Sequence, residues 1–537
     1  MKRRGIKKDL SRRDFVKTAA GAGVGAATGS GLLGNRLAGA EQGGGAQLNQ
    51  MRNLAEWEAP PPPIPASEIK ETTKADIVVV GAGLSGMCAA LSAAEAGAKT
   101  ILIEKSKSFL AHGSHNAAIG SRLQQRLGFD IGRQEVVAEL LKWAGNKADA
   151  RLVNLWANKS GEVANWLLDM AEAAGIAVSI FLRYSHDEFY KEWPTAHVFG
   201  GGNEDLLRML ENSALKKGVG IRYSTRAMQL LREGTRKGRV TGVVAQAADG
   251  YKRLDANAVL LCTGDYGHDR QMMQKYCAWA ADVPSNVYMP ALNTGDGHKM
   301  GLWIGAAMQE ETPHAPMIHT IGAGPMVGEP FLRVNILGER YENEDVPVQY
   351  VCNAVMRQPR NTAWTVFDDN YAKQAASMGS GLGRSPSTPE AITKAIAAGL
   401  TVKADTIEEL AKKMQVPAVT LKAAVARHTQ LAQIGSDLDF GKRPDRLTTI
   451  EKPPFYASKV IAALLAVMGG LDINTKMQVR DTEGSVIPGL YAAGNVSGNF
   501  FANDYPTMCP GLSHGRAFTF GRFAGLNAAA AVKDMKA

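Results

Sequence analysis

One segment near the start of the chain constrains the fold more than any other. Residues 78–105 have the sequence VVVGAGLSGMCAALSAAEAGAKTILIEK. The short apolar, β-branched run at residues 76–80 predicts a buried parallel strand. A helix is expected over residues 84–96 and a second strand over residues 100–104. These elements predict a β-α-β unit whose glycine-rich turn lies between the first strand and the helix.

The three glycines of this G-x-G-x-x-G turn have separate roles. Gly81 is expected to make the tight turn, Gly83 to let a pyrophosphate approach the backbone, and Gly86 to let helix and strand pack closely. The pyrophosphate would lie at the helix N-terminus, where free N–H groups and the helix dipole favour negative charge. Glu104 ends the second strand, where a carboxylate can accept hydrogen bonds from a ribose diol. The expected dinucleotide contacts are Gly81, Gly83, Leu84, Ser85, Gly86, Glu104 and Lys105.

Helices and strands alternate along the rest of the chain. Further helices are expected over residues 134–143, 150–174, 203–217, 392–398 and 406–414. Further strands are expected over residues 220–223, 239–245 and 258–262. The chain ends with a predicted strand at 489–493 and a helix at 515–531. Because the first and last segments would complete one dinucleotide fold, we expect an inserted domain between them.

The first 40 residues carry most of the positive charge. They hold nine Lys or Arg and two Asp, a net of +7, so the rest of the chain carries 9 − 7 = +2. A nearly neutral body is not expected to bind nucleic acid. Paired Arg12 and Arg13, a weakly apolar stretch at residues 18–33 and a small-residue site at 38–40 are typical of a twin-arginine signal peptide. An ordinary secretory signal and a disordered basic tail are the alternatives.

We therefore expect the twin-arginine machinery to export the protein to the periplasm or the outer face of the cytoplasmic membrane. Residues 41–73 are rich in Gly and Pro and predict a semi-rigid linker, with order beginning near Lys74. The five cysteines are scattered and predict no disulfide framework. No paired Cys/His spacing indicates a metal site, and no C-x-x-C-H indicates covalent haem.

Four glycine-containing stretches favour FAD over NAD as the dinucleotide. Residues 486–498 (VIPGLYAAGNVSG) resemble the second flavoprotein motif, with Gly494 and Asn495 near the ribityl chain. Residues 260–267 contain Gly264, and residues 293–301 contain Asp296, in stretches that resemble strand ends and turns beside FAD. Residues 114–120 (SHNAAIG) resemble a stretch that lies against the flavin ring, with Ser114 and Asn116 as expected contacts. Each stretch taken alone could be a structural glycine turn.

With these motifs, residues 74–537 resemble the FAD-binding subunits of fumarate reductase and succinate dehydrogenase. That superfamily also includes flavocytochrome c-type reductases, urocanate reductases and 3-ketosteroid dehydrogenases. The resemblance implies an α/β fold with a Rossmann-like FAD-binding domain, residues 74–304 and 461–537, and an inserted α+β capping domain, residues 305–460. It implies that substrate lies between the two domains against the flavin. The FAD is expected to be held non-covalently, because no family His stands clearly at a linkage position.

The chain departs from the fumarate reductases at the residues that handle dicarboxylates. Val348 occupies the position of the proton-donating Arg, and Tyr505 stands where an Arg clamps the substrate. The family's His ahead of M-G-G is also missing. Two substrate carboxylates would therefore be poorly compensated, so fumarate and succinate are not expected as substrates. Tyr505-Pro506 resembles the ketosteroid dehydrogenases, in which a Tyr polarises a ketone, so we expect a conjugated carbonyl compound, steroid-like or phenolic.

Three residues are catalytic candidates. The phenol of Tyr505 can donate a hydrogen bond to a carbonyl oxygen, stabilise an enolate-like transition state or relay a proton. Tyr350 lies two positions after the vacant Arg position, and Arg516 lies near the start of the last helix. Packing at a domain seam for Tyr505, a place in the cap core for Tyr350 and a solvated or phosphate-facing role for Arg516 are the alternatives.

The sequence as a whole predicts an exported FAD-dependent oxidoreductase that reduces an activated C=C bond, enone-like or related, by hydride transfer from flavin N5. Because no haem site is expected, a separate redox partner, a cytochrome or a quinol-linked system, would exchange electrons with it. Two alternatives stay open. One is a 3-ketosteroid dehydrogenase acting oxidatively, and the other is an FAD-bearing electron carrier or binding protein with a degenerate site.

Overall fold

The computed structural model describes residues 55–181, 190–234, 237–283, 290–309, 313–320, 324–378 and 388–537. The predicted signal peptide and the start of the predicted linker lie outside these residues. Within the described ranges, every helix is too short or too polar to span a lipid bilayer.

A six-stranded sheet forms the centre of the FAD-binding domain. Its order is β18-β19-β11-β2-β3-β7, and every pairing is parallel except that of β18 with β19. The strands are β2 (Ile77–Val80), β3 (Thr100–Ile103), β7 (Gly220–Arg222), β11 (Ala258–Leu261), β18 (Gln478–Arg480) and β19 (Val486–Ala492). All residues of β2, β3 and β11 are buried, as expected for apolar strands covered on both faces. The parallel register sets Val78 opposite both Ile101 and Val259.

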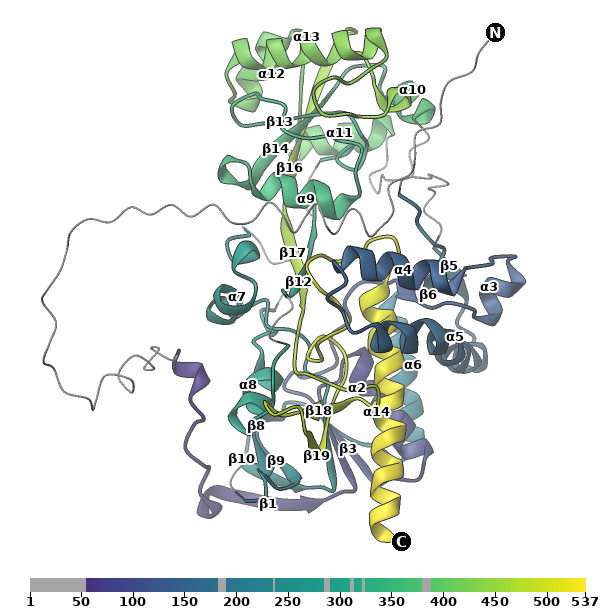
Figure 1. Ribbon diagram of the computed structural model, residues 1–537, viewed down its shortest axis with the longest axis vertical. Helices are drawn as coiled ribbons and strands as arrows, with labels where there is room; N and C mark the ends of the chain where they lie inside the picture. The colour runs from purple at the N-terminus through teal and green to yellow at the C-terminus, as the bar shows by residue number, and fades with distance from the viewer. Residues whose placement is uncertain are drawn as a thin grey trace, which may run out of the picture. The chain divides into compact units, whose positions relative to one another are not determined.

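Helix α2 follows β2 through the glycine-rich turn, and the C-terminal helix α14 packs along it (Figure 1). A Cβ on Gly521 would lie 2.3 Å from the Ser85 carbonyl oxygen, and one on Gly525 would lie 2.2 Å from that of Ala89. Only glycine allows so close an approach. The helices of this domain are α2 (Leu84–Glu95), α3 (Arg122–Arg126), α4 (Arg133–Trp143), α5 (Ala150–Ala173), α6 (Asn203–Lys216), α7 (Arg270–Tyr276), α8 (Asp296–Trp303) and α14 (Leu512–Lys536).

A second sheet begins before the point where order was expected. Its order is β1-β10-β9-β8, formed by β1 (Ile69–Lys74), β8 (Arg226–Arg232), β9 (Val240–Ala247) and β10 (Gly250–Asp255). We had expected order from about Lys74, but β1 pairs in parallel with β10 and a short 3-10 helix, η2 (Glu56–Glu58), precedes it. The sequence of β1, IKETTK, is polar and largely exposed, so no apolar periodicity marked it. A small sheet of β4 (Asn116–Ala117), β5 (Val178–Ile180) and β6 (Ala196–Phe199) completes the domain.

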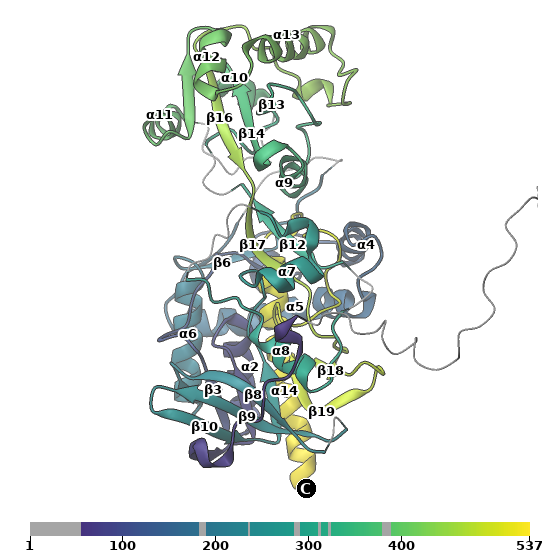
Figure 2. The ribbon, with the colours of Figure 1, turned by 90° about the vertical axis from the view of Figure 1, so that its left-hand side faces the viewer.

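The inserted region has a sheet and an apolar core of its own. The sheet order is β13-β14-β16-β15, formed by β13 (Leu332–Asn335), β14 (Thr362–Phe367), β15 (Thr401–Ala404) and β16 (Phe455–Ile461). Its helices are α9 (Val348–Met356), α10 (Tyr371–Ser377), α11 (Pro389–Ala397), α12 (Ile407–Met414) and α13 (Ala418–Ile434). Strand β16 leads directly into β17 (Ala463–Met468), which pairs with β12 (Ala315–His319) (Figure 2). The sequence had indicated α11 and α12 but none of the four cap strands.

Predicted helices and strands of the FAD-binding domain match the structure to within one or two residues for most elements. There are two exceptions. The strand expected over residues 489–493 is β19, which begins at Val486, and the last helix, expected over residues 515–531, begins at Leu512 and continues to Lys536. Gly511 adopts a left-handed backbone with φ of +82° and turns the chain into the helix three residues earlier than expected. No Pro or Gly interrupts the residues after Gly525, so the helix continues nearly to the end of the chain.

We predict that Gly525→Ala destabilises the protein because its methyl group would collide with the backbone of α2. Overpacking of this kind costs about 1–3 kcal/mol in the free energy of unfolding, to be measured by urea denaturation. Gly220→Ala is the matched control, since a Cβ there meets its nearest neighbour at 3.7 Å, an ordinary contact. Equal stability of the two variants would show that the close approach of α14 to α2 does not matter.

Candidate active site

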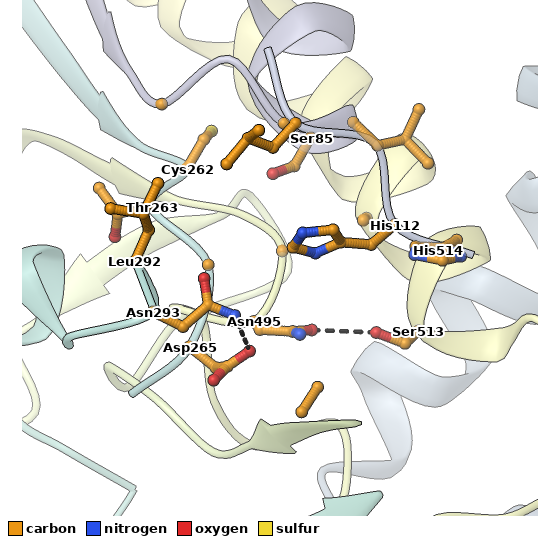
Figure 3. Close-up of a pocket in the computed structure, with 18 of the residues that line it drawn as sticks. Ser85, His112, Cys262, Thr263, Asp265, Leu292, Asn293, Asn495, Ser513 and His514 are labelled. Carbon is orange, nitrogen blue, oxygen red and sulfur yellow. Dashed lines mark hydrogen bonds between the residues drawn. The ribbon is translucent and has the colours of Figure 1, made fainter. Parts of the chain in front are cut away.

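A cavity of about 370 Å³ lies against the first glycine-rich turn and draws its walls from both ends of the chain (Figure 3). This volume is within the usual range for ligand sites. The predicted FAD contacts that line it are Gly81, Gly83, Leu84, Ser85, Glu104, Lys105, Ser114, Gly264, Asp296, Gly494 and Asn495. Segments separated by several hundred residues therefore meet in one place.

The glycines of the turn differ in what surrounds them. A Cβ on Gly81, whose φ is +105°, would lie 2.4 Å from the Cys262 carbonyl oxygen, and one on Gly86 would lie 1.8 Å from that of Gly81. Gly86 therefore does not line the cavity but lets the helix pack closely on the turn. A Cβ on Gly83 would meet no atom within 4 Å. The backbone at Gly83 thus faces open space, which a ligand can occupy at the N-terminus of α2.

Glu104 closes the turn and also lines the cavity. Its Oε2 accepts a hydrogen bond from the Ala82 N–H at 2.9 Å, and its Oε1 accepts one from the Ser106 N–H at 2.8 Å. Each carboxylate oxygen has a further lone pair, so both can still accept from a ribose diol. Nearby, the Thr263 hydroxyl oxygen is buried without a hydrogen-bond partner among the described residues. The donors and acceptors that line this part of the cavity fit FAD.

The two lining cations are already paired with a carboxylate. Lys105 Nζ lies 3.1 Å from Asp296 Oδ2, and Arg226 Nη2 lies 3.1 Å from Asp296 Oδ1. Burial raises the pKa of Asp296, but Lys105 and Arg226 outweigh it and hold that pKa below its usual value. Sequence reasoning did not select Arg226, which begins β8 and has no motif around it. This corner of the cavity is polar but close to neutral.

Tyr505 also lines the cavity, and its ring packs against that of Phe501, with ring centroids 5.6 Å apart. The apolar residues that line the cavity include Met317, Leu465, Ala466 and Pro510. Tyr505 is 2% exposed, and its phenol oxygen accepts a hydrogen bond from the Ser513 N–H at 3.0 Å. The Ser513 hydroxyl donates to Asn495 Oδ1 at 3.0 Å, the contact drawn in Figure 3. A phenol can donate one hydrogen bond as well as accept, so Tyr505 has the chemistry to donate to a ligand oxygen.

Asp265 lines the cavity but was not selected from the sequence. It follows Gly264, and its carboxylate accepts hydrogen bonds from the Gly267 N–H at 2.7 Å and from Asn293 Nδ2 at 3.0 Å (Figure 3). Burial raises the pKa of Asp265 to about 6, although Gly267 and Asn495 act in the opposite direction. The sequence did contain a signal for Asp265: in residues 260–267 (LLCTGDYG) it stands where the A-T-G-G motif has its second Gly.

Three histidines also line the cavity: His112, His115 and His514. Burial, reinforced by His514 and His268, lowers the pKa of His112 to about 4. Burial likewise lowers the pKa of His514. His112 and His514 are therefore uncharged near pH 7. Among the described residues, no group of three or more His, Cys, Asp or Glu is arranged to hold a metal ion.

The structure does not bring Tyr350, Arg516 or Asn116 to the cavity wall. Tyr350 stacks on Trp143, with ring centroids 4.6 Å apart. Arg516 is a buried residue of α14, and its side chain donates a hydrogen bond to Asn495 Oδ1 at 2.8 Å. Asn116 is fully buried, and its amide donates to Asn203 Oδ1 at 2.8 Å. Of the three catalytic candidates, only Tyr505 lines the cavity.

The loop that carries Tyr505 is held by the cap helix α9. The Asp504 carboxylate accepts hydrogen bonds from Asn353 Nδ2 at 2.9 and 3.1 Å, and from Gln349 Nε2 at 3.2 Å. Burial raises the pKa of Asp504, while Asn353 and Gln349 lower it in part. Val348, in the vacant Arg position, is the buried first residue of α9. The helix that could have carried a catalytic Arg instead anchors the loop of Tyr505.

Comparisons with known proteins agree with this geometry. The family model described as FAD binding domain matches residues 76–507. Vinyl phenol reductase of Lactiplantibacillus plantarum is 31% identical over 492 residues, covering 84% of this chain and 96% of that protein. Fumarate reductase (cytochrome) of Shewanella frigidimarina is 29% identical, covering 84% of this chain and 77% of that protein.

Among solved structures, 3-ketosteroid-Δ4-(5α)-dehydrogenase from Rhodococcus jostii RHA1, in complex with 4-androstene-3,17-dione, superposes with a TM-score of 0.69. The two chains are 25% identical, and the match covers 87% of this chain and 99% of the other.

We predict that Gly83→Leu folds normally but loses FAD, because its side chain would enter only the open space at the turn. The dissociation constant for FAD should rise at least about tenfold, corresponding to roughly 1.4 kcal/mol. The measurements are the flavin-to-protein ratio after purification and titration of the apoprotein. Gly132→Leu, at the start of α4 and outside the cavity lining, is the control and should keep its flavin. Full FAD occupancy in Gly83→Leu would contradict this placement.

Proposed function

This chain belongs to the family of FAD-binding domains, and we propose that it reduces the activated C=C bond of an uncharged conjugated compound, such as an enone or a vinyl phenol. It is an FAD-dependent oxidoreductase acting on CH–CH or C=C groups. The reductive direction and the substrate class are the parts proposed here. A separate electron donor, a cytochrome or a quinol-linked system, is part of the same proposal.

One observation carries the choice of an uncharged substrate. Lys105 and Arg226 are the Lys and Arg side chains among the described residues that line the cavity, and both pair with Asp296. With Glu104, which also lines the cavity, two carboxylates balance these two cations, so no net positive charge is left to compensate a substrate carboxylate. Burying a carboxylate without such a partner is costly. The apolar residues that line the cavity with Tyr505 favour a neutral, largely hydrophobic substrate.

When bound, FAD would supply the hydride, and a proton from solvent would complete the reduction at the neighbouring carbon. Tyr505 supplies the polar contact that activates the substrate. The Ser513 N–H holds the phenol oxygen, so the Tyr505 O–H can point to the activating oxygen of the substrate. A hydrogen bond there strengthens as negative charge develops on that oxygen during reduction. The surrounding apolar wall excludes water and makes the same hydrogen bond stronger.

A second candidate function is the oxidation of a 3-ketosteroid. The pair Tyr505-Pro506 and the structural similarity to a ketosteroid dehydrogenase favour it. The reductive direction is favoured instead by the similarity to vinyl phenol reductase, because the match covers 96% of that protein.

We predict that anaerobic, dithionite-reduced holoenzyme is reoxidised by neutral conjugated compounds and much less by carboxylates. The panel contains an enone, 4-vinylphenol, acrylate, fumarate and 4-androstene-3,17-dione, and the readout is the return of flavin absorbance. An unpaired carboxylate in the cavity should slow fumarate and acrylate by at least about a hundredfold, equivalent to roughly 2.7 kcal/mol.

The other outcomes of this panel are informative. Reoxidation by fumarate alone would overturn the proposed substrate class. Reduction of the oxidised holoenzyme by a saturated 3-ketosteroid would favour the dehydrogenase. A flavin that responds to none of these compounds would favour an electron carrier or binding protein.

We also propose that the protein is exported through the twin-arginine route, on the strength of Arg12, Arg13 and the residues that follow them. The double variant Arg12→Lys/Arg13→Lys should leave precursor in the cytoplasm, as measured by cell fractionation and immunoblotting. The chain offers a matched control in its other Arg pair, Arg3→Lys/Arg4→Lys, which should be exported normally. Equal export of both variants would refute the proposal.

A further inference from the structure

Arg516 is a buried cation that the proposed reaction has not yet used. Its side chain is 1% exposed and lies in the second turn of α14. Nη1 donates to the Ser497 carbonyl oxygen at 3.0 Å, and Nη2 donates to Asn495 Oδ1 at 2.8 Å. The guanidinium carbon lies 5.0 Å from the ring centre of Phe501 and 5.8 Å from that of Phe500. All of these partners are neutral.

No ion pair within the described part of the chain includes Arg516, and its Nε is buried without a hydrogen-bond partner. Burial lowers the pKa of the guanidinium to about 9, and the phenol of Tyr505 acts in the opposite direction. A buried charge without an opposite charge is expensive to keep in a folded protein. A negative charge nearby would favour the charged form of Arg516. Tyr505 is an ionisable side chain whose negative charge would do so.

The contacts around Asn495 connect Arg516 to Tyr505. Asn495 Oδ1 accepts from both Arg516 Nη2 and the Ser513 hydroxyl, and the Ser513 N–H donates to the Tyr505 phenol oxygen. On the other side, the ring of Phe501 lies between the two, 5.6 Å from the ring of Tyr505. Tyr505 lines the cavity and Arg516 does not. Arg516 thus lies behind the phenol, away from the substrate.

We propose that Arg516 is a positioning residue that makes Tyr505 a stronger hydrogen-bond donor by stabilising the negative charge that shifts onto its phenol oxygen. This inference rests on the proposed function for the role of Tyr505, but the electrostatic link between the two side chains can be tested without turnover. When the Tyr505 O–H bonds to the activating oxygen of the substrate, electron density on the phenol increases. The neighbouring guanidinium favours that change because the intervening medium is poorly polarisable.

Other titratable groups line the cavity or, like Asp504, lie beside Tyr505 in the chain, and they affect Tyr505 differently. His112 and His514 are uncharged near pH 7, since burial lowers the pKa of each. Asp265 and Asp504 become negative as the pH rises and then oppose ionisation of the phenol. His115 lines the cavity as well. Arg516 is a cation among the described residues that favours a phenolate at Tyr505, so its removal should have a resolvable effect.

The test is a tyrosine titration of the FAD-loaded enzyme by ultraviolet difference absorbance. Subtracting the Tyr505→Phe spectrum isolates the signal of Tyr505 in the parent, in Arg516→Gln and in Arg516→Lys. Burial raises the pKa of a tyrosine and a neighbouring cation lowers it, so the comparison between variants measures the contribution of Arg516. Arg516→Gln should raise the pKa of Tyr505 by at least about one unit, and Arg516→Lys should restore most of the difference.

The rate of flavin reoxidation by an enone should follow the same order: parent, then Arg516→Lys, then Arg516→Gln. A lower stability of Arg516→Gln with an unchanged Tyr505 titration would mean that Arg516 only supports the fold, and would overturn the proposal. If Arg516→Gln does not fold, Arg516→Met replaces it, because Met is of similar length and uncharged. An unchanged Tyr505 titration in that variant would overturn the proposal.

The two proposals can fail separately. If Arg516→Gln shifts the phenol but no conjugated compound oxidises the reduced flavin, the proposed substrate class is wrong and the electrostatic link stands. If enones react but the Tyr505 titration does not depend on Arg516, the reductase stands and this inference is wrong.

Discussion

The close approach of backbone to backbone around the first turn of α2 is the constraint on which the rest of the structure depends. Gly81 lies against β11, Gly86 lies against Gly81, and Gly521 lies against Ser85, each with no room for a Cβ. This packing holds the N-terminus of α2 at the carboxyl ends of β2 and β11, with the backbone at Gly83 facing open space. Free N–H groups and the helix dipole thus point to one place, where a pyrophosphate is stabilised.

Around that fixed point the cavity is assembled from parts of the chain that are distant in sequence. Asp265 follows β11, the loop of Tyr505 precedes α14, and Leu465 and Ala466 belong to β17, which leads into the cap. Hydrogen bonds of Asp504 to α9 and of Tyr505 to the backbone of α14 hold the loop between cap and core. Movement of the cap would therefore act directly on the residue proposed to activate the substrate.

Charge is distributed so that the cavity is nearly neutral while its surroundings are not. Lys105 and Arg226 are paired with Asp296, and the histidines at positions 112 and 514 are uncharged near pH 7. Arg516, which does not line the cavity, is a buried cation with no ion pair among the described residues. A cation in that place can stabilise charge that develops on a protein group without binding a charged substrate. An Arg at position 505 or 348 would instead favour a substrate that carries a carboxylate. The position of a guanidinium therefore determines which chemistry it supports.

The sequence by itself determined the β-α-β unit, the cofactor class and the vacant Arg positions, because these depend on local patterns: apolar runs, glycine spacing and residue types within short motifs. It also singled out Tyr505, through a dipeptide. It did not indicate β1, whose polar sequence becomes a strand only by pairing with β10, or the lining residues Asp265 and Arg226. Nor did it show that Tyr350 and Arg516 lie away from the cavity wall. Tyr350 stacks on Trp143, and Arg516 is buried against Asn495 and Ser497. Only the tertiary structure decides those positions, because they depend on how elements far apart in sequence pack against one another.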